Sequence, residues 1–147
     1  MKKILFVCIV FLIGITTVSA QGAYEVKVDW TVDQSSNCLE HPTPWGYLVG
    51  LTIYDAANAN AIVVYNAYNL ENSSATSSTF SAAQTQVEDY CNAYHENTPS
   101  LTVVVAVRMY DLSSEEQFCF DKRTQSGYSC SYFYLNGVLV DGLLVTE

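Results

Sequence analysis

An Asn-Gly pair at positions 136 and 137 is the feature that most limits how this chain can fold. It stands between two apolar-rich runs, which is the strongest short-range signal for a two-residue β-hairpin turn. Asn and Gly both tolerate the positive φ angles that such a turn requires. The register set by this turn and by a second turn at residues 123–126 places Cys119 opposite Cys130. The sequence therefore predicts a three-stranded antiparallel meander over residues 115–146, stapled by its own disulfide.

The first 20 residues have the pattern of an export signal. Lys2 and Lys3 precede an apolar run at residues 4–15 that is too short for a comfortable membrane span. Small residues at 18–20 favour cleavage before Gln21, and the alternative is an N-terminal anchor that is retained. We expect an exported protein, periplasmic or extracellular, with no membrane span after cleavage and a single domain at residues 21–147.

The expected mature chain is strongly acidic. It keeps four cationic residues, Lys27, Arg108, Lys122 and Arg123, against 15 acidic ones, which gives a formal charge of −11. A surface of this charge repels nucleic acid and anionic membranes, so we expect no nucleic-acid partner. It suits a soluble protein, or one that meets cationic partners or calcium.

Hydrophobic periodicity predicts a mainly β fold. Apolar and polar residues alternate over 23–33, and apolar side chains share one face over 45–55, as in strands of an antiparallel sheet. Two more strands are expected at 61–68 and at 101–111, the most apolar segment. Apolar residues recur at helical spacing over about 82–96, and Ser81 with Gln84 forms a capping box before them. Together with the meander, these segments predict an antiparallel β-sandwich of about seven strands with one short helix. Such a domain would share its shape with immunoglobulin-like domains, but no residue motif selects that family.

Four cysteines follow the export signal, at positions 38, 91, 119 and 130. An even number in an exported chain predicts two disulfides, with three possible connectivities. The hairpin register favours Cys119–Cys130, which leaves Cys38–Cys91 as the second pair.

Metal binding is a competing interpretation of the same segments. Cys38 with His41 and Cys91 with His95 could close a tetrahedral zinc site if the thiols stayed reduced. Calcium is the other candidate, bound by carboxylates at strand ends if these meet at one pole of the sandwich: Asp33, Asp55, Asp111, Glu115 and Glu116. We favour the disulfides, and expect neither a metal nor a cofactor.

The functional prediction depends on tyrosines. No Ser-His-Asp arrangement or phosphate-binding loop is present in the sequence, so we expect no enzymatic activity. In the meander, Tyr128, Tyr132 and Tyr134 share the face opposite the core. Either the helix carrying Tyr90 and Tyr94 covers that face, or the tyrosines form a platform for a glycan, peptide or protein.

The sequence thus predicts an exported, non-enzymatic binding or adhesion module. The first alternative is a structural or accessory subunit of a bacterial envelope complex, and the second is a calcium- or zinc-dependent domain. No pattern in the sequence sets the oligomeric state.

Overall fold

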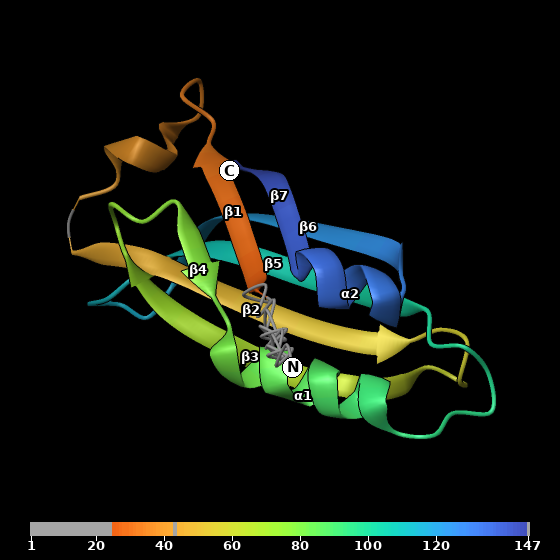
Figure 1. Cartoon of the computed structure of the whole chain (residues 1–147). Coiled ribbons are helices and arrows are strands. Elements are labelled where there is room, and N and C mark those ends of the chain that lie inside the picture. The colour runs from red at the N-terminus through yellow and green to blue at the C-terminus, as the bar shows by residue number, and fades with distance from the viewer. Residues whose placement is uncertain (1–24, 43, 147) are drawn as a thin grey trace, which may run out of the picture.

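The computed structural model describes residues 25–42 and 44–146, in which two sheets of four and three strands face each other (Figure 1). The predicted mainly β sandwich of seven strands with two disulfides is confirmed. The predicted export signal at residues 1–20 and its cleavage site lie outside the described residues.

The larger sheet has the strand order β3-β2-β5-β6, and all its strand pairs are antiparallel. Its members are β2 (Trp45–Asp55), β3 (Ala61–Asn72), β5 (Leu101–Asp111) and β6 (Gln117–Tyr128). The alternation in β2 and β5 turns one set of apolar side chains, such as Val49 and Val105, inwards. The other set lies on the side away from the smaller sheet, which we call the outer face.

The smaller sheet has the order β4-β1-β7, formed by β4 (Ser77–Thr79), β1 (Val26–Val32) and β7 (Val138–Val145). Its strands run across those of the larger sheet (Figure 1). β1 pairs with β4 antiparallel but with β7 parallel, so one pair departs from the expected antiparallel arrangement. The core lies between the sheets and includes Val28, Trp30 and Val140.

Helices fill the remainder of the layer that contains the smaller sheet. The predicted helix is present as α1 (Ser81–Asn92), which buries Ala83 and Val87 in the core. It ends four residues earlier than expected. The predicted capping box is wrong, because Phe80 is the N-cap and no side chain caps the helix. A short 3-10 helix, η1 (Asn37–Glu40), follows β1.

The predicted meander is wrong. β6 continues straight through the expected turn at 123–126, and residues that were expected to form a strand fold as a second helix, α2 (Cys130–Asn136). The hydroxyl of Ser129 caps the start of α2 by accepting from the N–H of Tyr132, at 3.1 Å. Gly137, at φ 72°, ends the helix and donates its N–H to Phe133 O at 2.8 Å. The Asn-Gly pair therefore terminates a helix instead of turning a hairpin.

All four cysteines in the described part of the chain form disulfides, but the predicted pairing is also wrong. The bonds are Cys38–Cys119 and Cys91–Cys130. The register that placed Cys119 opposite Cys130 does not exist, because β6 and α2 do not pair. Cys119 lies near the start of β6 and Cys130 lies just beyond its end. The two disulfides thus tie both ends of this edge strand to the rest of the domain.

Candidate functional site

The three tyrosines predicted to bind a ligand lie close together, but not on one sheet face. Tyr128 ends β6, whereas Tyr132 and Tyr134 are on α2. The rings of Tyr128 and Tyr132 are 5.6 Å apart, and the Tyr134 hydroxyl donates to Asn92 Oδ1 at 2.5 Å. The flat platform expected from the meander is therefore absent from these residues. Ligand binding here stays a prediction, supported mainly by Tyr132, which is 46% exposed.

The zinc interpretation is wrong. Cys38 and Cys91 belong to different disulfides, which lie near opposite ends of β6. His41 stacks on the ring of Phe118, with centroids 3.9 Å apart. His95 instead faces the backbone carbonyl of Tyr90. The two predicted cysteine–histidine pairs are therefore not brought together.

The calcium interpretation is wrong as well. Since β2 and β5 run antiparallel, Asp55 and Asp111 lie at opposite ends of the larger sheet. Asp33 accepts hydrogen bonds from the hydroxyl and the N–H of Ser35, and these lower the pKa of its carboxyl. Within residues 25–42 and 44–146, no group of three or more Asp, Glu, His or Cys side chains is placed to hold a metal ion. Asp33, Asp55 and Asp111 instead accept hydrogen bonds from backbone N–H groups of the turns that follow their strands.

The buried side chain of Asp55 stabilises the turn between β2 and β3. Its carboxylate is fully buried and accepts from the N–H groups of Ala57 and Ser100 at 3.0 and 2.8 Å, the Tyr90 hydroxyl at 2.9 Å, and the Asn58 amide. Burial raises the pKa of Asp55, but these hydrogen bonds together lower it more, so the net pKa is below its usual value. Burial first, and then the bond and charge of Asp55, raise the pKa of Tyr90 to about 12. This network fixes the β2–β3 turn to α1.

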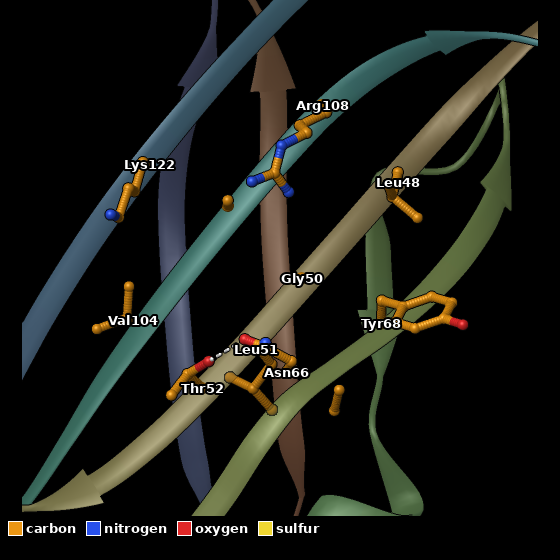
Figure 2. A pocket seen from close by; sticks show the side chains of 11 residues that line it. Leu48, Gly50, Leu51, Thr52, Asn66, Tyr68, Val104, Arg108 and Lys122 are labelled. Carbon is orange, nitrogen blue, oxygen red and sulfur yellow. Dashed lines mark hydrogen bonds between the residues drawn. The ribbon is translucent and has the colours of Figure 1, made fainter. Parts of the chain in front are cut away.

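The outer face of the larger sheet contains a hollow of about 420 Å³ (Figure 2). At its floor, Gly50 of β2 pairs with Ala106 of β5, so two positions with little or no side chain lie side by side. Longer side chains from four strands stand around them. We call this site the outer hollow; it is lined by Leu48, Gly50, Leu51, Thr52, Asn66, Ala67, Tyr68, Val104, Ala106, Arg108 and Lys122.

A β-bulge shapes one end of the outer hollow. The register between β2 and β3 shifts so that Leu51 pairs with Ala67 while Ile53 pairs with Val64. Two residues of β3 therefore oppose one of β2, and one of the two, Asn66, has a φ of 44°. Bulges re-aim side chains, and Asn tolerates positive φ better than most residues. Asn66 accepts a hydrogen bond from the hydroxyl of Thr52 at 3.3 Å, within the hollow (Figure 2).

Two cationic side chains, Arg108 and Lys122, stand at the other end. Arg108 turns its guanidinium towards Gly50 (Figure 2). Arg108 of β5 pairs with Phe120 of β6. Lys122 lies two residues further along β6, opposite Ala106, so the two cations are diagonal neighbours on adjacent strands. By the register, the outer-face positions of the four strands include no acidic residue. Neither cation makes an ion pair with another described residue.

Exposed apolar side chains extend this face onto the edge strand β3. Ile62, Tyr68 and Leu70 are each more than half exposed, and the register puts all three on the outer face. The sequence showed in part that this face carries apolar side chains, because the second face of β5 includes Val104 and Ala106 beside Arg108.

No protein-family model, curated protein or solved structure matches this chain. Among the described residues, none of the helices is long and apolar enough to cross a membrane.

Proposed function

We propose that this protein is an exported, non-enzymatic binding module whose ligand occupies the outer hollow. One observation carries the proposal: an open hollow holds two cations without acidic partners, in a chain whose formal net charge is −9. In an acidic protein, cations usually pair with nearby carboxylates, as Lys27 does with Asp29 at 3.2 Å. Arg108 and Lys122 are left for a group that comes from outside.

Three further features support this proposal. The volume of the outer hollow is within the range of about 300–1,000 Å³ that is common for ligand sites. Its lining includes no carboxylate or imidazole that could act as a general base beside Lys122, Tyr68 or Thr52, which favours binding over catalysis. The two disulfides favour an oxidising compartment, and so support export.

A second candidate function is an accessory subunit of a larger envelope complex. The observation that favours it is β3, an edge strand on which Ile62, Tyr65 and Leu70 are exposed. Exposed apolar edge strands pair readily with other chains. Sedimentation velocity over a wide concentration range tests this candidate, which predicts self-association or a co-purifying partner. A strictly monomeric, partner-free protein would argue against it.

The binding proposal is tested by screening purified protein on glycan and peptide arrays beside two variants. Gly50→Val fills the floor of the outer hollow, whereas Thr124→Val places a valine on the same face but outside the lining. We expect ligands bound by the wild type to be retained by Thr124→Val and lost by Gly50→Val. Ligands that bind Gly50→Val equally well would place the site elsewhere, and the Tyr132→Ala, Tyr134→Ala double variant then tests the tyrosine cluster. An array on which nothing binds the wild type would contradict the binding function.

A further inference from the structure

The outer hollow has the charge pattern of an anion site. The remaining cations of the described chain have partners: Lys27 pairs with Asp29, and Arg123 donates to the carbonyl of Gly142 at 2.7 Å. Arg108 and Lys122 instead face the same hollow as diagonal neighbours, an arrangement in which like charges repel. A bound anion between them removes this repulsion and gains two charge-assisted hydrogen bonds.

A carboxylate fits the position of Arg108 well. The planar guanidinium of Arg108 can bind a carboxylate through two parallel hydrogen bonds, and the ammonium of Lys122 adds a positive charge beside it. The absence of a side chain on Gly50 leaves room for the guanidinium to lie across the floor of the hollow (Figure 2).

The other end of the outer hollow suits a molecule rich in hydroxyl groups. Thr52 and Asn66 present a hydroxyl and an amide, which can both donate and accept hydrogen bonds. Tyr68 stands at the rim, 73% exposed, and offers an apolar ring with a polar tip. A sugar ring has matching chemistry, because it combines an apolar ring face with hydroxyl groups around its edge.

The backbone of the sheet argues against a peptide in the same place. Gly50 pairs with Tyr68 on one side and Ala106 on the other, so the main-chain groups of the floor are used within the sheet. Extended peptides are commonly recognised by unpaired backbone groups at a sheet edge. The floor of the outer hollow offers side chains only, which suits a saccharide better than an extended chain.

We propose that the outer hollow binds an acidic saccharide, a uronic-acid-containing glycan whose carboxylate lies between Arg108 and Lys122. This inference rests on the proposed binding function and specifies the ligand class for the same site.

The test is calorimetric titration with oligomers of galacturonic acid, with the methyl esters of the same oligomers, and with an oligoglutamate peptide of similar charge. We expect binding of the acid, at least about tenfold weaker binding of the uncharged ester, and weakening of the acid complex by salt. Arg108→Gln and Lys122→Gln should each weaken acid binding about tenfold or more, whereas Lys27→Gln, which removes an equal charge outside the hollow, should not.

The other outcomes separate this inference from the binding function. Equal binding of acid and ester, abolished by Gly50→Val, would overturn the carboxylate assignment and leave a binding module. Binding of oligoglutamate without either saccharide would overturn the saccharide assignment. If none of the three probes binds, but the arrays identify another ligand that Gly50→Val no longer binds, only the ligand class is overturned. Failure on the arrays as well would overturn both proposals.

Discussion

Arg108 on β5 extends over Gly50 on β2, so that its Nη1 atom lies 3.4 Å from the position that a Cβ on Gly50 would occupy. That separation is ordinary van der Waals contact with the end of a flexible side chain. The floor of the outer hollow is therefore open to substitution.

We expect Gly50→Val to leave the free energy of unfolding unchanged or to raise it by up to about 1 kcal/mol, because Val favours strands more than Gly does. Gly46 of the same strand is the matched control: a Cβ there would lie 2.5 Å from the carbonyl oxygen of Glu71, so Gly46→Ala should destabilise markedly. Urea unfolding measures both variants. A loss of more than about 1 kcal/mol in Gly50→Val would contradict an open floor.

Proteolysis of the unreduced, denatured protein tests the disulfide pairing. Trypsin cuts after Lys27, Arg108, Lys122 and Arg123, which puts Cys38 and Cys91 on one fragment, Cys119 on a second and Cys130 on a third. The bonds in the structure hold all three fragments together, and a further cut after Glu71 should leave the Cys38 fragment joined to that of Cys119. Release of the 28–108 fragment, seen by mass spectrometry, would instead show the pairing of Cys38 with Cys91.

Each disulfide should contribute strongly to stability. On the chain-entropy model, replacing both cysteines of a pair by Ala costs about 4.5 kcal/mol for Cys38–Cys119, and about 4 kcal/mol for Cys91–Cys130. The sequence separations behind these values are 81 and 39 residues. Urea unfolding of the two double variants measures the losses. Losses below about 1 kcal/mol would mean that the pairs do not constrain the unfolded chain as the model requires.

Asp55 should make the fold acid-sensitive. Its pKa is lower in the folded protein than the ordinary 3.8, so its contribution to stability is complete above about pH 4 and is lost as the pH falls through the lowered value. Asp55→Asn should lower the free energy of unfolding by about 2 kcal/mol at pH 7. It should also make that free energy depend less on pH below about pH 4. Asp89→Asn, an equal charge change at an exposed site on α1, is the control. If Asp55→Asn lost stability below about pH 4 as steeply as the wild type, that result would contradict this role.

The hydroxyl of Tyr90 should lose its proton at a higher pH than that of an ordinary tyrosine. Its pKa of about 12 exceeds the ordinary value of 10, so the stability it contributes is present below pH 10 and is lost as the pH rises towards 12. The difference in absorbance at 295 nm between the wild type and Tyr90→Phe isolates this titration. Asp55→Asn should lower the midpoint, because it removes the neighbouring negative charge. A midpoint near 10 would contradict the burial of this hydroxyl against Asp55.

Strands whose side chains alternate regularly were predictable from the sequence. β1 and β2 occupy the segments expected from an apolar face, since burying one face of a sheet requires that pattern, and β5 occupies the segment expected from its high apolar content. The three-residue strand β4 was missed, because so short a segment has too few residues to show a period.

The region around α2 was not predictable from local signals. Residues 130–136 are rich in aromatic side chains, which favour strands, and Asn-Gly is common in hairpins and also at helix ends. Tertiary contacts decide between the two: Cys130 bonds to Cys91 on α1, and Gly137 approaches the backbone of Glu25 so closely that a Cβ would clash. Both partners are remote in sequence, so the turn pattern alone favoured the wrong structure.

The outer hollow was predictable only in part. Arg108 on a regular outward face was visible in the sequence, but its proximity to Lys122 depends on the pairing of β5 with β6. The bulge that directs Asn66 depends in turn on the register of β3. Strand register is a long-range property, and one sequence does not determine it.

The parallel pairing of β1 with β7 determines how the domain responds to force. A pull on the N-terminal end of β1 and the C-terminal end of β7 acts along two neighbouring strands in opposite directions, because the strands point the same way. Their inter-strand hydrogen bonds are then loaded in shear, all at once, rather than opened one after another. We therefore expect this strand pair to resist stretching along its own direction more than an antiparallel hairpin would.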